Sequence, residues 1–136
     1  MPEPVPPCRT LPEIIERQAL EAPKRTALWW ESSTTSFGEL QDRIQRLAGA
    51  LAASGQAGDR VAVLAWNCPA FITLIYAVPA AGQVLVPLNA RLAPAEWCDQ
   101  LQRSGASRLF ADPELLATLE GRADLPDTLE TIALGT

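Results

Sequence analysis

The sequence contains no histidine and a single lysine, Lys24, among its 136 residues. The absence of histidine removes the most common general base of enzymes and the most common side-chain ligand of metal ions. The three cysteines, Cys8, Cys68 and Cys98, lie far apart and form no Cys-x-x-Cys pair, so we expect no zinc site. Unpaired thiols are typical of a reducing compartment, and we therefore expect a cytoplasmic protein in which Cys68 and Cys98 are structural.

Glycine-rich motifs for phosphate binding are also missing. The sequence has neither Gly-x-Gly-x-x-Gly nor a Walker loop, in which glycines precede a lysine and then serine or threonine. Its most hydroxyl-rich segment, ESSTTSFGEL over residues 31–40, has one glycine near its end and no lysine. A phosphate cradle needs glycines that turn successive backbone N–H groups inward, with a cation beside them. We therefore interpret these hydroxyl groups as turn residues and as a helix cap.

Strong positive charge and long apolar runs are absent as well. The formal net charge is -5 and the basic residues are scattered singly, which argues against a nucleic-acid partner. Pro79 and Pro87 interrupt the apolar segment 70–88, whereas a transmembrane helix needs about 20 consecutive apolar residues. Residues 1–9 lack the basic and apolar regions of a signal peptide, and we expect them to be a flexible proline-rich lead-in.

The residues that are present predict a soluble globular domain, because 48% are hydrophobic and 20% are charged. A chain of this length is long enough to bury a core of its own. Apolar residues at helical spacing, preceded by capping residues or proline, predict helices over residues 11–21, 37–54, 69–81, 94–104 and 113–120. The spacings of Thr10 with Glu13 and of Ser36 with Glu39 predict capping boxes, and Gly55 is the predicted C-cap of the second helix. Short apolar or β-branched runs predict strands over residues 26–30, 34–36, 60–65, 84–88, 107–111 and 129–134.

The order of these elements predicts an α/β fold. A helix and a β-hairpin come first, and helices then alternate with strands. Strands separated by single helices form right-handed crossovers, so we expect a mainly parallel sheet with helices on both faces. Ligands of such sheets bind beyond the carboxyl ends of the strands. The loops expected there, AWNCPA over residues 65–70 and PLNARLAP over residues 87–94, carry no phosphate-binding motif.

The remaining polar and aromatic residues show no spacing that is typical of a catalytic or ligand-binding motif. We interpret Lys24, Arg91 and Arg103 as surface charges, with contact to an anionic ligand as the alternative for the two arginines. Asn67 follows a predicted strand, and an Asx turn or local cap is favoured over a ligand contact. The tryptophans are interpreted as core or interface residues rather than a platform for bases: Trp29, Trp30, Trp66 and Trp97. We therefore assign no catalytic, cofactor-binding or metal-binding residue.

Four segments resemble one known family. They are SFGEL, GDRVAVLAWN, AVPAAGQVLVPLNARLAPAEW and SGASRLFAD, in this order along the chain. Together they resemble the amino-terminal part of the adenylate-forming enzymes, which include acyl-CoA synthetases, aryl-CoA ligases, luciferases and the adenylation domains of peptide synthetases. The resemblance covers residues 9–134. Asn67 and the PLNAR segment look like acyl-CoA or aryl-CoA synthetases, with a peptide-synthetase adenylation domain as the alternative.

The sequence departs from the family pattern at three positions. Phe37 stands where tyrosine is usual, Pro79 where lysine is common, and Ala93 where a helix-capping serine or threonine is common. Loss of a capping side chain costs about 1 kcal/mol of helix stability. None of these departures falls on a residue that the family uses for chemistry.

The resemblance implies that residues 10–136 form the first subdomain of an acyl-CoA synthetase-like fold. Such enzymes convert a carboxylic acid and ATP to an acyl-adenylate and then to a thioester with coenzyme A, with Mg²⁺ as cofactor. Their phosphate loop, nucleotide-binding residues and catalytic lysine lie downstream of the part that this sequence resembles. We therefore expect an amino-terminal fragment that binds no cofactor by itself.

The expected partner of such a fragment is the remainder of the parent enzyme. A fragment exposes the apolar surface against which the missing part packs, so self-association is also expected. Two alternatives remain open. One is a stand-alone interaction module of the same fold, and the other is an independent nucleotide-binding domain of the Rossmann type.

Overall fold

The computed structural model describes Met1, residues 3–4 and residues 6–135. Residues 2 and 5 of the predicted lead-in, and Thr136, lie outside this part. The helices are α1 (Leu11–Glu21), α2 (Phe37–Ser54), α3 (Pro69–Ala80), α4 (Pro94–Ser104) and α5 (Pro113–Ala117). The strands are β1 (Thr26–Trp30), β2 (Ser33–Ser36), β3 (Arg60–Leu64), β4 (Val84–Pro87), β5 (Arg108–Ala111) and β6 (Glu130–Ala133).

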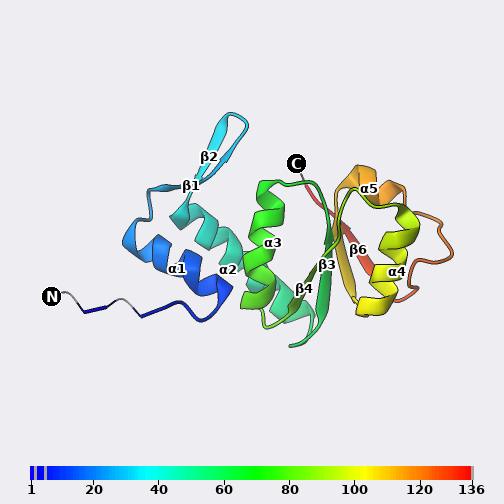
Figure 1. Ribbon diagram of the computed structural model, residues 1–136, viewed down its shortest axis with the longest axis horizontal. Helices are drawn as coiled ribbons and strands as arrows, with labels where there is room; N and C mark the ends of the chain where they lie inside the picture. Colours follow the sequence, from blue (N-terminus) through cyan, green and yellow to red (C-terminus); the bar gives the residue numbers. More distant parts are fainter. Residues whose placement is uncertain (2, 5, 136) are drawn as a thin grey trace.

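The strands form two sheets, and the predicted α/β fold is confirmed. Strands β1 and β2 pair as an antiparallel hairpin, which projects from the rest of the molecule (Figure 1). The other strands form a 4-stranded parallel sheet in the order β4-β3-β5-β6. Helices α2 and α3 lie on one side of this sheet, and α4 and α5 lie on the other (Figure 1).

The central strand β3 is covered on both faces, as its apolar sequence predicted. Val61 and Val63 belong to the core beneath α1, α2 and α3. Ala62 and Leu64 belong to the core beneath α4. All four side chains are 0% exposed, which is typical of a strand inside a parallel sheet. The sheet therefore separates two cores that share this strand.

Two helices begin with different hydrogen bonds. The predicted capping box of α2 is confirmed: the Glu39 N–H donates to Ser36 Oγ at 3.1 Å, and the Ser36 N–H donates to Glu39 Oε2 at 2.8 Å. The Ser36 N–H also lowers the pKa of Glu39. The capping box expected at Thr10 was wrong, because Glu13 Oε2 instead accepts the Arg9 N–H at 2.7 Å and the Thr10 side chain makes no capping bond.

Helix α5 is shorter than predicted, ending at Ala117 instead of residue 120. The N–H groups of Thr118 and Leu119 donate to carbonyls three residues earlier, and the Thr118 hydroxyl donates to the Leu115 carbonyl at 2.7 Å. These tighter bonds replace the α-helical pattern with turns. Within the described residues, none of the helices has both the length and the apolar content that a membrane span requires.

Candidate functional site

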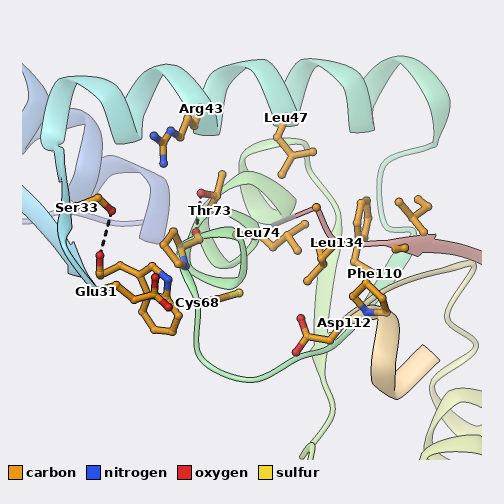
Figure 2. Close-up of a pocket in the computed structure, with 17 residues that line it drawn as sticks. Glu31, Ser33, Arg43, Leu47, Cys68, Thr73, Leu74, Phe110, Asp112 and Leu134 are labelled. Atoms are coloured by element: carbon orange, nitrogen blue, oxygen red, sulfur yellow. Dashed lines mark hydrogen bonds between the residues drawn. The ribbon is translucent and has the colours of Figure 1, made fainter. Parts of the chain in front are cut away.

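A cleft of about 940 Å³ lies where β5 and β6 end, and Figure 2 shows the side chains that line it. Its walls come from the β1–β2 hairpin, α2, the first turns of α3 and the ends of β5 and β6. The carboxyl ends of parallel strands are where ligands of open α/β sheets bind. The cleft is therefore the position at which a functional site is expected in this fold.

The lining of the cleft has an apolar and a polar part. Leu47 of α2, Leu74 of α3, Phe110 of β5 and Leu134 after β6 form the apolar part (Figure 2). The charged and thiol groups of the polar part are Glu31, Arg43, Cys68 and Asp112. Helix α2, helix α3 and the segment after β6 each contribute a leucine to the wall of the cleft, and this lining favours an apolar ligand.

The hydroxyl groups of the cleft are engaged in local hydrogen bonds. Ser33 Oγ donates to the Trp30 carbonyl at 3.0 Å, and Thr73 Oγ1 donates to the Pro69 carbonyl at 2.9 Å. Arg43 is exposed, and its Nη1 lies 3.5 Å from Thr35 Oγ1, at the limit of a hydrogen bond. The hydroxyl-rich segment therefore stabilises the hairpin and the start of α2, as the sequence predicted for Ser36 and its neighbours.

Asp112 joins two strand ends at the edge of the cleft. Its Oδ2 accepts the Trp66 N–H at 2.8 Å, which ties the end of β5 to the loop after β3. After β3 the chain continues to β4 on one side of the sheet, and after β5 it continues to β6 on the other side. The space between the ends of β3 and β5 is therefore the topological switch point of the sheet. Asp112 precedes α5 but makes no side-chain cap, because its carboxylate is used by Trp66.

We expect Asp112→Ala to lower the free energy of unfolding by about 1–2 kcal/mol, since the Trp66 N–H loses a charged acceptor. Urea denaturation followed by circular dichroism measures this change. The matched control is Asp42→Ala, which removes an exposed i,i+4 pair with Arg46 at 2.8 Å and should cost less than about 0.5 kcal/mol. Equal effects of the two substitutions would contradict the linking role of Asp112.

The charged residues that the sequence placed on the surface are found there. Lys24 and Arg91 are exposed. Arg103 pairs with Asp99 at 2.9 Å on the exposed side of α4. The structure does not bring Lys24 or Arg103 into the cleft.

Asn67 differs from its predicted role. The structure gives its side chain no hydrogen bond within the described residues, and Asn67 lies exposed beside a small pocket with Trp29 and Trp30. The Asx turn forms instead at Asn89, whose Oδ1 accepts the Arg91 N–H at 3.0 Å. Of the four tryptophans, Trp97 is the one in a core, at 3% exposed, whereas Trp29 is 79% exposed.

The cysteines are unpaired, as expected. Cys98 is fully buried, and burial raises the pKa of its thiol, so a structural role is consistent with its surroundings. Cys68 is half-buried at the start of α3 and lines the cleft. Sequence reasoning did not single out Arg43 or Asp112 as cleft residues. The position of Asp112 directly after a buried strand was the available signal.

The lining of the cleft carries more negative than positive charge. Arg43 is the one cation among its described lining residues, and the two carboxylates, Glu31 and Asp112, would repel an anionic ligand. Gly135 is the one glycine of that lining, whereas phosphate-binding loops use several glycines to turn N–H groups inward. No group of three His, Cys, Asp or Glu side chains that would hold a metal ion occurs within the described residues.

The fold and the cleft together define the amino-terminal subdomain of the acyl-CoA synthetase-like fold, with a hairpin followed by a parallel sheet. The model of the family described as AMP-binding enzyme matches residues 15–134, and the chain belongs to this family. The resemblance to adenylate-forming enzymes is thereby confirmed over nearly the whole chain.

The relatives of this chain include CoA ligases and synthetases. Feruloyl-CoA synthase of Amycolatopsis sp is 41% identical over 108 residues, which are 79% of this chain and 22% of that enzyme. Indoleacetate–CoA ligase of Aromatoleum aromaticum is 35% identical over 115 residues, 84% of this chain and 22% of that enzyme. The structure of Mycobacterium tuberculosis fatty acyl CoA synthetase matches with a TM-score of 0.82 and 28% identity, over 90% of this chain and 26% of that one.

The chain spans about a fifth of the length of the curated relatives just described. The chain matches the amino-terminal AMP-binding part of acyl-CoA ligases, as the sequence predicted.

Proposed function

We propose that the chain is the amino-terminal part of an ATP-dependent acyl-CoA synthetase. Such an enzyme joins a carboxylic acid to ATP, giving an acyl-adenylate and pyrophosphate, and then forms a thioester with coenzyme A and releases AMP. The observation that carries this proposal is the family match over residues 15–134, supported by 41% identity to a feruloyl-CoA synthase. ATP, Mg²⁺ and coenzyme A are the proposed cofactors of the whole enzyme.

The part played by these residues is structural in this proposal. Residues 10–136 supply the parallel sheet and the hairpin that form a wall of the enzyme, and residues 1–9 are a flexible lead-in. The cleft is lined by one arginine and two carboxylates, and this net negative charge is unfavourable for binding a triphosphate. We therefore assign catalysis and cofactor binding to the remainder of the parent enzyme, which is the proposed partner, and place the protein in the cytoplasm.

The exposed apolar side chains support a second part of the proposal, self-association of the chain when it is alone. Trp29 is 79% exposed, Trp66 is 50% exposed and Leu20 is 80% exposed. Large exposed apolar side chains are typical of surfaces that pack against another polypeptide. The alternative, a stand-alone interaction module of the same fold, uses the same surfaces for a different partner.

We expect the purified chain to show no ATP–pyrophosphate exchange with any carboxylic acid, because its strand ends carry no phosphate-binding groups. The exchange of labelled pyrophosphate into ATP measures this, with the Amycolatopsis feruloyl-CoA synthase and ferulate as the positive control. Titration calorimetry with ATP and AMP should likewise show no heat of binding. Exchange well above background would contradict the proposal, and micromolar ATP binding without exchange would favour a Rossmann-type nucleotide-binding domain.

A further inference from the structure

A buried thiol lies beneath the segment that joins α5 to β6. Cys98 of α4 is 0% exposed, in the core between α4 and the sheet. Residues 120–129, which we call the strap, run beside α4 (Figure 1). The side chains of Arg122 and Asp124 in the strap lie next to the Cys98 thiol. Access of solvent to this thiol therefore depends on the strap.

Few hydrogen bonds hold the strap to the rest of the molecule. The backbone N–H groups of Arg122, Leu125 and Leu129 donate to carbonyls three residues earlier, at 3.3, 3.3 and 3.2 Å. The ion pair between Arg122 and Asp124, at 2.9 Å, lies within the strap. Among the described residues, one hydrogen bond reaches the strap from α4, where Gln102 Nε2 donates to the Asp124 carbonyl at 2.6 Å. Most hydrogen bonds of the strap are therefore local.

The burial of the strap is also low. None of residues 120–129 is fully buried, and its apolar contacts with the core beneath α4 come from the half-buried Leu125 and Leu129. The two ends are fixed more firmly, because Leu119 is 0% exposed and β6 pairs with β5. Segments with few buried apolar contacts open at a lower free energy than the core to which they are attached. The strap has these properties and Cys98 beneath it does not.

The closed strap keeps the thiol of Cys98 unreactive in two ways. Burial raises the pKa of this thiol, and the thiolate is the nucleophilic form of cysteine. A group added to the sulfur also needs space, which a fully buried side chain in a close-packed core does not have. Reaction at Cys98 therefore requires that the strap first moves away from α4.

We propose that the strap opens by local unfolding while the parallel sheet stays folded, and that this opening makes Cys98 a redox-sensitive switch. The co-reactant is a disulfide. The Cys98 thiol loses its proton to solvent, its sulfur attacks one sulfur of the disulfide, and the other half leaves as a thiolate. The mixed disulfide at Cys98 does not fit beneath the closed strap, so the modification holds the strap open until a reducing thiol removes it.

The test follows the reaction of the full chain with the aromatic disulfide dithiobis(nitrobenzoate), measured by the absorbance of the released thionitrobenzoate. Cys8→Ser and Cys68→Ser leave Cys98 as the one thiol. We expect labelling without urea to be at least about 100-fold faster than global unfolding allows. We also expect its dependence on urea to be less than about half of the global m value. A dependence equal to the global m value, or no labelling without urea, would overturn the proposal.

Two substitutions in this background separate local opening from global unfolding. Gln102→Ala removes the hydrogen bond from α4 to the strap and should raise the labelling rate by about 5-fold. Ile44→Val is the matched control, because Ile44 is 2% exposed in the core on the other face of the sheet. It weakens the whole fold by a similar amount but should change the labelling rate by less than about 1.5-fold. Equal acceleration by both substitutions would identify global unfolding as the route and overturn the proposal.

Trypsin tests whether the modification holds the strap open. We expect labelling of Cys98 to speed cleavage after Arg122 by at least about 10-fold, and dithiothreitol to reverse this change. Cleavage after Arg46, on the exposed side of α2, is the internal control and should not change. Unchanged cleavage after Arg122 would overturn the proposal, because the strap would then close over the modified thiol. Equal acceleration after Arg46 would also overturn it, since the whole chain would then have unfolded.

Discussion

Trp97→Ala is expected to lower the free energy of unfolding by about 3–5 kcal/mol, the usual cost of truncating a buried aromatic side chain. Trp97 is 3% exposed and lies in the core between α4 and the sheet, together with Leu101 and Leu109. Its Nε1–H donates to the Asn89 carbonyl at 2.8 Å. The substitution therefore removes both the side-chain volume and a hydrogen bond to the loop after β4.

Trp97→Phe separates these two contributions. Phenylalanine keeps most of the ring volume but leaves the Asn89 carbonyl without its donor, so we expect a loss of about 1–2 kcal/mol. Trp29→Ala is the control, because Trp29 is 79% exposed and truncation of an exposed side chain changes stability by less than about 0.5 kcal/mol. Urea denaturation followed by far-ultraviolet circular dichroism measures all three variants. An effect of Trp97→Ala as small as that of Trp29→Ala would contradict the packing described for α4.

Trp97 also determines the position of a loop at the carboxyl edge of the sheet. Asn89 is held by the indole on its carbonyl, while its side chain accepts the Arg91 N–H at 3.0 Å. The start of α4 adds a further bond, from the Ala93 N–H to Glu96 Oε2 at 2.8 Å. The missing capping hydroxyl at Ala93 is thus partly replaced, since one half of a capping box remains.

The helices and strands whose positions were predicted accurately are those with capping residues, proline, glycine or an apolar run in their own sequence. The start of α2 follows from the Ser36–Glu39 capping box, and the bounds of α4 follow from Pro94 at its first turn and Gly105 after its end. β3 was recognisable because its apolar run needs cover on both faces. In each case the residues that decide the structure are neighbours in the sequence.

The cleft was not predicted because it depends on contacts between distant segments. The Asp112–Trp66 bond joins residues 46 positions apart, and no local pattern marks either of them as a partner. Leu47 belongs to the periodic apolar stripe of α2, and this pattern does not tell a core position from a cleft wall. The family resemblance indicated the fold, but the sequence alone did not show that these residues surround one cleft.

Arg108, like Asp112, makes a hydrogen bond to a residue distant in the sequence that could not be predicted from the sequence. It is 7% exposed although it carries a charge, and its Nη2 donates to the Ser54 carbonyl at the end of α2. Nearby, Gln83 Nε2 donates to the Leu51 carbonyl at 3.0 Å. Two buried side chains from the sheet region therefore satisfy carbonyls of the last turn of α2, which have no partner within the helix.

Gly55 explains how these side chains reach the helix end. The sequence predicted a C-cap glycine there, and the structure confirms the position, with an extended backbone at φ -142 rather than a left-handed one. A Cβ at this residue would lie 2.8 Å from Gln83 Nε2 and 2.9 Å from Arg108 Nη2. Glycine is therefore favoured at position 55 because two buried side chains lie close to its Cα. The backbone of Gly55 is not in the left-handed conformation that usually explains a C-cap glycine.

We expect Arg108→Met to lower the free energy of unfolding by about 3 kcal/mol, because it leaves the Ser54 carbonyl without a charged donor and replaces a buried, bonded group. Methionine keeps the length and much of the apolar stem, so lost volume contributes little. Thermal and urea unfolding of the purified chain measure the change.

Two controls distinguish the helix-end contact from surface charge effects. Arg103→Met removes a pair with Asp99 that is 79% exposed on the arginine side, and it should cost less than about 0.5 kcal/mol. Glu130→Gln removes the Arg108–Glu130 pair, which spans 3.4 Å with the glutamate 66% exposed, while keeping the contact to α2. If Glu130→Gln cost as much as Arg108→Met, the ion pair and not the cap would be the stabilising contact. A small effect of Glu130→Gln beside a large effect of Arg108→Met places the stabilisation at the end of α2, where the helix meets the sheet.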